Sequence, residues 1–289
     1  MKPEVIALTS VVIVHFAFAI ADSLWKVPLR EVSAEKGIFI RNLWTTAFLG
    51  IVAWVMQENY HFSWQDVIFS VLISFISYWG LYFFVKSQQY LPLSLIGRFL
   101  VLKSVFHFWW SIIYYKEPFV WQKAILFGIS FFASLLIALK ASSERAKLQR
   151  QGILFAVLAS IFWTISYAFF KEATEKLGPS QFGFVLELTI LCVSGFQLFW
   201  QRKLTQVFAL SGKSFLFLLL IAFLGALGVY FSNLSYLLVP LSSLLIIRVT
   251  GDTIPLAIGL FIYKEKLTQW QYIGIILSLI ANWGLMVLE

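Results

Sequence analysis

Long apolar segments separated by short polar connections run through the whole chain. A membrane-spanning helix needs about 20 consecutive, mainly apolar residues, and ten segments reach or nearly reach that length. They are residues 4–25, 38–56, 67–86, 93–115, 119–139, 152–170, 180–200, 214–236, 240–263 and 270–288. The pattern therefore predicts an all-α integral membrane protein with ten transmembrane helices.

The second half of the chain repeats features of the first half at a constant offset. Identical residues 148 positions apart are Gly80 and Gly228, Tyr82 and Tyr230, Pro92 and Pro240, Ser94 and Ser242, Lys116 and Lys264, and Glu117 and Glu265. Such a register indicates a duplication. Because five spans is an odd number, the second copy must enter the membrane upside down. We therefore predict two inverted five-helix repeats, residues 1–140 and 152–289, joined by a basic loop at 141–151; secondary transporters are often built this way.

Composition agrees with a membrane protein. The chain is 60 % hydrophobic and 18 % aromatic, which leaves too little polar surface to cover a soluble globule. Its net charge of +8 is spread between the apolar segments, so it indicates loop and interfacial charges and no nucleic-acid partner. The single cysteine, Cys192, allows no disulfide and no thiolate metal site. The N-terminal segment resembles a cleavable signal, but its counterpart at 152–171 favours a retained helix.

Ionisable residues inside apolar segments are costly and usually face a cavity or a partner. The fourth segment carries Arg98, Lys103 and His107, and its repeat partner, the ninth, carries Arg248 and Asp252. Residues four apart share a helix face. We expect these two helices to line a site for an anionic or zwitterionic group; the alternative is that the charges only lock helix packing.

The ninth segment also contains a candidate hinge. Pro255 has no N–H, so the carbonyl of Gly251 loses its helical partner beside Asp252. This suits a gate, although a tolerated kink explains it equally well.

A second polar stripe lies on the first and sixth segments. His15, Ala19, Asp22 and Lys26 fall at helical spacing, and adding 145 gives Ser160, Thr164, Tyr167 and Lys171. Two matching stripes favour a cavity lining. His15 or Asp22 is a candidate to carry a coupling proton, because histidine titrates near neutrality and burial raises the pKa of a carboxyl group.

Two further positions stand out. Arg41 and Glu187 fall at near-equivalent places in the two halves, so they are expected to pair across them, unless Arg41 lies at the headgroups. In the eighth segment, Gly225 and Gly228 belong to a face of small residues suited to close helix contact, and Asn233 beside it is expected to reach the cavity.

No catalytic motif is present. Residues 211–214 (SGKS) resemble the end of a phosphate-binding loop, but Val207 replaces its first glycine and no strand precedes it. Neither a zinc-protease motif nor a nucleophile elbow occurs. We predict no enzymatic activity and no cofactor.

Several stretches together resemble the EamA-type permeases of the drug/metabolite transporter superfamily. They are residues 163–171 (WTISYAFFK) with a weaker copy at 18–26, residues 90–94 (YLPLS) and 239–242 (VPLS), Pro255, and residues 264–274 (KEKLTQWQYIG). Phe18 replaces the family's tryptophan, the first copy lacks a proline equivalent to Pro255, and Glu187 stands where the family often has an apolar or basic residue. The recurring Glu117 and Glu265 are expected to cap the helix that follows each.

The resemblance implies alternating access, with spans 1, 3, 4, 6, 8 and 9 lining the route and spans 5 and 10 outside, in a bacterial inner membrane. It places both termini in the cytoplasm, whereas the distribution of Lys and Arg places them outside. We expect a monomer or homodimer in the lipid bilayer that carries a small-molecule substrate. An amino acid or related zwitterion is favoured; a nucleotide-sugar, nucleoside or cofactor-like metabolite is the alternative. The alternatives of a different class are a non-transporting membrane scaffold, which has no use for five buried ionisable residues on two related helices, and an intramembrane enzyme, which should show a nucleophile or metal set.

Overall fold

Within the part of the chain that the structure describes, all the regular secondary structure is helical. A computed structural model describes residues 3–58, 63–139, 146–239 and 253–287. Its longer helices are α1 (Pro3–Leu24), α2 (Ala34–Met56), α3 (Trp64–Tyr90), α4 (Leu93–Ile113), α5 (Trp121–Leu139), α6 (Ala146–Tyr167), α8 (Pro179–Trp200), α9 (Gly212–Leu238) and α12 (Gln269–Val287). Shorter ones are η1 (Pro28–Arg30), α7 (Phe170–Leu177), η3 (Leu204–Gln206), α11 (Thr253–Ala257) and the π-helical η4 (Ile258–Ile262).

Short polar residues determine where several helices begin. The side chains of Ser33, Ser63 and Ser211 each accept a hydrogen bond from the backbone N–H three residues further on. They satisfy amides that the first helical turn leaves open. Ser63 and Asp66 complete a capping box. The beginnings of α2, α3 and α9 are thus determined locally.

Two features around α6 differ from the sequence pattern. The helix begins at Ala146, inside the stretch expected to be a connecting loop. At its other end the chain tightens, since the N–H of Phe169 bonds to the carbonyl of Ser166, three residues back. A separate amphipathic helix, α7, follows with Phe170 and Leu177 buried. The apolar run alone does not reveal this break.

Six helices in the described residues are long and apolar enough to cross a membrane: α1 with η1, α2, α3, α6, α8 and α9. Large apolar side chains are also exposed on α5 and α12, where Phe132 is 74 % and Trp283 63 % accessible. Exposed apolar surface of this kind indicates contact with lipid. The protein is therefore an integral membrane protein, and a total of ten spans stays a prediction.

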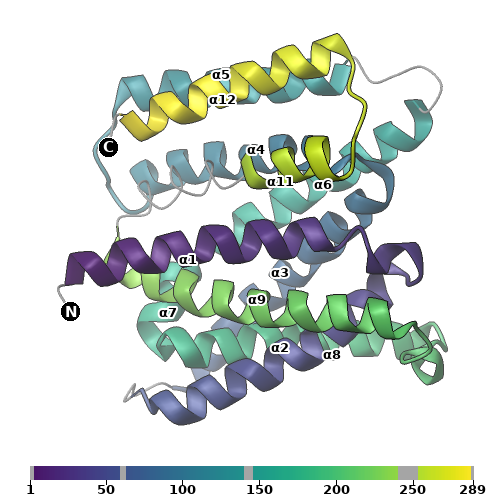
Figure 1. The fold of residues 1–289 in the computed structure, drawn as a ribbon. Coiled ribbons are helices and arrows are strands. Elements are labelled where there is room, and N and C mark those ends of the chain that lie inside the picture. The colour runs from purple at the N-terminus through teal and green to yellow at the C-terminus, as the bar shows by residue number, and fades with distance from the viewer. Residues whose placement is uncertain (1–2, 59–62, 140–145, 240–252, 288–289) are drawn as a thin grey trace.

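Helices from the two halves of the chain pack against each other. α3 lies along α6, α1 along α9, α2 along α8, and α5 along α12. Figure 1 shows α5 and α12 together at one edge of the molecule and α2 and α8 at the opposite edge. The first turn of α1 and the last turn of α12 lie on the same side (Figure 1).

One close contact occurs twice. A Cβ at Gly80 of α3 would lie 2.3 Å from Cδ1 of Trp163 on α6, and one at Gly228 of α9 would lie 2.7 Å from Cε1 of Phe18 on α1. Both glycines are needed because an aromatic ring occupies the space of a side chain. The two glycines lie 148 positions apart and the two aromatic residues 145 apart, which are the offsets that relate the two halves.

The helix-ending corners at Lys116 and Lys264 also match. Both residues have a positive φ, 57° and 50°, which is uncommon for a residue other than glycine. The next N–H, of Glu117 or Glu265, bonds at 3.1 Å to the carbonyl of Ser111 or Gly259, six residues back. The same unusual backbone geometry is thus formed at equivalent positions.

Candidate functional site

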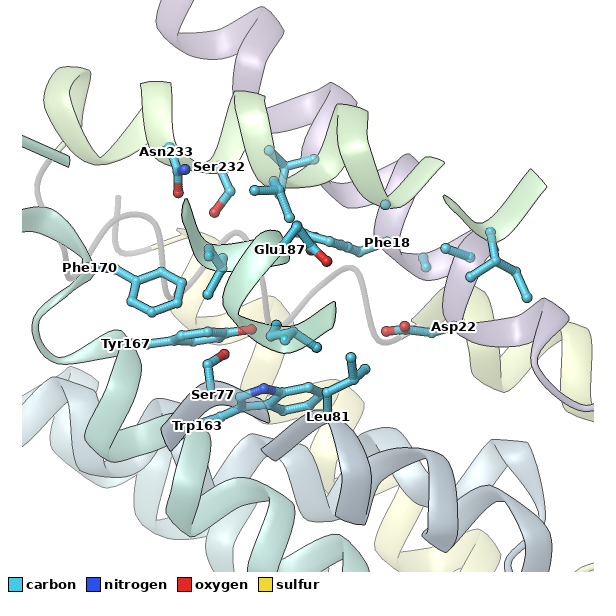
Figure 2. A pocket seen from close by; sticks show the side chains of 18 of the residues that line it. Phe18, Asp22, Ser77, Leu81, Trp163, Tyr167, Phe170, Glu187, Ser232 and Asn233 are labelled. Atoms are coloured by element: carbon cyan, nitrogen blue, oxygen red, sulfur yellow. The ribbon is translucent and has the colours of Figure 1, made fainter. Parts of the chain in front are cut away.

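A cavity of about 150 Å³ lies between the halves and is shown from close by in Figure 2. By a comparable measure one water needs about 10–15 Å³, so the cavity has room for a small organic molecule. Its lining is Val14, His15, Phe18, Ala19, Ala21, Asp22, Trp25, Arg41, Ser77, Leu81, Lys103, Ser104, Trp163, Tyr167, Phe170, Leu186, Glu187, Ile190, Ile221, Gly225, Val229, Ser232, Asn233 and Pro255.

The lining comes from α1 and the turn that follows it, and from α2, α3, α4, α6, α7, α8, α9 and α11. The second and seventh spans were not expected to contribute, yet α2 supplies Arg41 and α8 supplies Leu186, Glu187 and Ile190. Among the described residues, no lining side chain comes from α5 or α12, which pack on each other. This agrees with their expected place outside the route.

Aromatic rings on α6 form one wall of the cavity. Trp163 and Tyr167 are stacked with centroids 6.0 Å apart and planes 15° from parallel, and Figure 2 shows both along the same side. The ammonium of Lys103 lies 5.0 Å from the centroid of the Trp163 ring and 5.4 Å from that of Tyr167. Such distances permit cation–π attraction. The predicted residues Lys103 and Tyr167 therefore meet at the cavity.

The polar stripe of α1 faces the same space. His15, Ala19 and Asp22 line the cavity, and Figure 2 shows the Asp22 carboxylate at one end. His15 donates through Nδ1 to the carbonyl of Val11 at 2.8 Å. Lys26 instead bonds to the carbonyl of Leu91 where α3 ends. The coupling role suggested for His15 and Asp22 stays a prediction.

The expected pairing of Arg41 and Glu187 is confirmed. Nη1 of Arg41 lies 2.5 Å from Oε2 of Glu187, and both residues line the cavity. Asn42 joins them, because its Oδ1 accepts from Arg41 at 3.0 Å and its Nδ2 donates to Glu187 at 2.6 Å. The pair links α2 of the first half to α8 of the second and does not lie at the headgroups.

Polar and small groups complete the lining. Asn233 reaches the cavity as expected and donates to the carbonyl of Pro179 at 3.0 Å. Ser77, Ser104 and Ser232 add hydroxyl groups. Pro255 also lines the cavity, on α11 just before the π-helical turn η4. π-Helical turns occur frequently at functional sites, and the hinge role of Pro255 stays a prediction.

Other candidate residues do not line the cavity or lie outside the described part. His107 is behind the wall: its Nε2 donates to the carbonyl of Thr164 at 3.0 Å, and its ring stacks on Tyr167. Arg98 belongs to α4, but its side chain is not among those that the structure describes. Arg248, Gly251 and Asp252 all fall in the stretch 240–252, which is also outside it.

Loop carboxylates from one half cap helices of the other. Glu265 accepts hydrogen bonds at 2.6 and 2.9 Å from the N–H groups of Leu93 and Ser94 at the start of α4. The expectation that it caps the following helix is therefore wrong; Thr268 and Gln271 cap α12. The sequence cannot reveal this, because the partner is about 170 residues away and is brought near only by folding.

Two more such carboxylates lie at the N-terminal ends of α8 and α9. Glu58 accepts from the N–H and hydroxyl of Ser180 at 3.0 and 2.7 Å, and Glu31 accepts from the hydroxyl of Ser211 at 2.7 Å. The bond from Ser211 holds the pKa of Glu31 below its usual value. Negative charge at a helix N-terminus is favourable, so these contacts join the halves at their loops.

The chemistry of the site suits binding. Cavity-lining side chains carry both signs of charge, on Asp22, Glu187, Arg41 and Lys103, beside aromatic rings. Within the described residues, no group of three or more His, Cys, Asp or Glu side chains is placed to hold a metal ion. The cavity can therefore take a molecule that presents both charges and an apolar part.

Comparisons with known proteins agree with this arrangement. Residues 150–287 match the model of the EamA-like transporter family. A solved structure, described only as a crystal structure of a protein, aligns over 99 % of this chain and 98 % of its own, with a TM-score of 0.64 and 11 % identity. At that identity the likeness concerns the fold alone. No curated protein matches the sequence.

Proposed function

We propose that this protein, whose residues 150–287 match the EamA-like transporter family, is a transporter of the drug/metabolite transporter superfamily that moves an amino acid or related zwitterionic metabolite by alternating access. Members of this family are membrane transporters, so the family match supports a transport role. The zwitterionic nature of the substrate is proposed in addition to that role. One observation carries it: both signs of charge line a cavity that lies between the halves.

The proposed architecture is ten helices in two inverted five-helix repeats, with domain boundaries at 1–140 and 152–289. The recurring Gly–aromatic contacts and the matching corners at Lys116 and Lys264 support it. So does the packing, because exchanging the halves turns the α3–α6 contact into the α9–α1 contact. An inverted repeat places a substrate site where its halves meet, which is where the cavity lies.

Further proposals concern the membrane, the oligomeric state and the residues that contact the substrate. We place the protein in a bacterial inner membrane as a monomer or homodimer, without a cofactor and without enzymatic activity. Arg98, Lys103, His107, Arg248 and Asp252 stay candidates for polar contact with the substrate, and of these Lys103 lines the cavity. Tyr167 and Asn233 also line it.

The test is uptake by the purified protein in liposomes. Saturable accumulation of at least one radiolabelled amino acid is expected from a panel that also holds nucleosides and a nucleotide-sugar. The variant Tyr167→Ala should raise the half-saturating concentration about fivefold or more, because it removes a stacked ring worth about 1 kcal/mol or more. Tyr114→Ala is the matched control, since Tyr114 is stacked on Trp110 away from the cavity. An absence of saturable uptake for every amino acid would contradict the proposal.

A second candidate is favoured by the aromatic wall. The parallel Trp163 and Tyr167 rings offer a stacking surface for a planar base. A nucleoside, nucleotide-sugar or cofactor-like metabolite would use that surface. Saturable uptake restricted to the nucleosides or the nucleotide-sugar in the same panel would replace the first candidate with this one.

A further inference from the structure

The Arg41–Glu187 pair is unusual for a contact that serves packing alone. Both side chains are nearly inaccessible, with Arg41 7 % and Glu187 2 % exposed, yet both lie on the cavity wall. Removing two charges from water is costly, and a buried ion pair is weak evidence for stability. The pair occupies the wall between the halves, where a substrate would be held.

Each member of the pair uses only one polar atom within the described part of the protein. Both hydrogen bonds of Arg41 come from Nη1, and both bonds to Glu187 are accepted by Oε2. A guanidinium has five N–H donors and a carboxylate has two acceptor oxygens. Nη2 and Nε of Arg41 and Oε1 of Glu187 are therefore left for a ligand.

Two neighbouring residues, Asn42 and Gly225, fix the position of the pair in the cavity wall. Asn42 bonds to both members of the pair and holds Nη1 of Arg41 and Oε2 of Glu187 in place. Gly225, also in the cavity lining, provides room for the guanidinium, because a Cβ there would lie 2.3 Å from Nη2 of Arg41. Figure 2 shows the side chain of Glu187 among the lining residues that surround the cavity. The pair is thus positioned before any ligand arrives.

A zwitterion is the complement of such a pair. Its carboxylate can accept from Nη2 and Nε of Arg41, while its ammonium donates to Oε1 of Glu187. Each of the four charges then lies next to one of opposite sign, so that no charge is left uncompensated in a medium of low dielectric constant. We propose that Arg41 and Glu187 together bind both charges of a zwitterionic substrate, with Asn42 and Gly225 as positioning residues.

Lys103 is a weaker candidate for the carboxylate, because its ammonium already lies over the rings of Trp163 and Tyr167. It is better placed to contact the substrate's side chain. The inference rests on the proposed function and names the site at which the zwitterion's charges are held.

The test measures how much the carboxylate and the ammonium of a substrate each contribute to its uptake. Uptake of radiolabelled phenylalanine by liposomes that contain the protein would be measured in competition with two analogues. Phenethylamine lacks the carboxylate, and 3-phenylpropionate lacks the ammonium. Wild type should prefer phenylalanine about tenfold or more over either analogue, the range of a charged hydrogen bond. The double variant Arg41→Gln/Glu187→Gln, which leaves no single buried charge, should lose most of both preferences while remaining monodisperse.

Two single variants, with one matched control, separate the contributions of Arg41 and Lys103. Gly225→Ala keeps both charges but displaces the guanidinium and should weaken phenylalanine uptake several-fold. Gly128→Ala is its control, because a Cβ at Gly128 of α5 meets nothing within 4 Å. Lys103→Gln should leave the preference over phenethylamine largely intact.

The outcomes separate the two proposals. If the folded double variant keeps both preferences, or if only Lys103→Gln abolishes the preference for a carboxylate, transport of a zwitterion stands and the Arg41–Glu187 assignment is overturned. If wild type takes up neither phenylalanine nor any other amino acid, the proposed function itself fails and the assignment fails with it.

Discussion

Replacing Glu187 alone with glutamine is expected to destabilise the protein by about 3–5 kcal/mol, the usual cost of leaving one member of a buried ion pair uncompensated. Arg41 is 7 % exposed and has Glu187 as its salt-bridge partner. Arg41→Gln should have a similar effect. The double variant Arg41→Gln/Glu187→Gln should be more stable than either single variant, because it buries no unpaired charge.

Thermal unfolding of the purified protein in detergent would measure this as a double-mutant cycle. Glu172→Gln is the matched control, because the Glu172–Lys176 pair is 2.9 Å apart but partly exposed, and such pairs contribute about 0–1 kcal/mol. Single variants that unfold together with wild type would show that water in the cavity already compensates the charge, and this account of the pair would be wrong.

Gly80→Ala is expected to give the second large loss, about 1–3 kcal/mol, which is typical of overpacking a well-packed interface. The added methyl group would lie 2.3 Å from Trp163, a ring that is 8 % exposed and also stacked on Tyr167. It would therefore separate α3 from α6 and shift the aromatic wall. Gly228→Ala should act similarly between α9 and α1.

The matched control is again Gly128→Ala, where the added methyl group meets nothing. That variant should be neutral or slightly stabilising, since alanine is favoured over glycine in a helix by about 1 kcal/mol. Melting temperatures measured side by side decide the matter. Equal melting temperatures for Gly80→Ala and Gly128→Ala would mean that the helices adjust freely, against the close contact described here.

Most of the helical structure could be predicted because lipid requires long apolar segments, and such segments are visible in the sequence. The offsets that relate Gly80 to Gly228 and Phe18 to Trp163 are visible in the sequence, but the contact of each glycine with an aromatic ring is seen only in the structure. The break before α7 was missed, because it depends on a local change in backbone hydrogen bonding within an apolar run.

The candidate site was predicted less completely. The stripe of α1, with Tyr167 and Lys103, could be found because polar residues are rare in apolar helices. The part of Arg41 and Glu187 in the cavity lining was missed, since a pair of opposite charges at related positions equally suits packing. Helical spacing also could not separate His107, behind the wall, from Lys103, which faces the cavity four residues away. Both share one face, and only the neighbouring helix decides which residue reaches the space.

The most direct test of the central claim, that this cavity binds the transported substrate, is protection of a cysteine placed in its wall. Cys192 is the protein's one cysteine, so Cys192→Ser provides the background for Ser232→Cys in the lining and for Lys213→Cys, exposed at the start of α9 and outside the lining, as the control. A water-soluble thiosulfonate reagent should label the Ser232→Cys variant, and a transported amino acid should slow that labelling without affecting the control. Labelling at Ser232→Cys that no transported amino acid slows would place the substrate elsewhere and contradict the account.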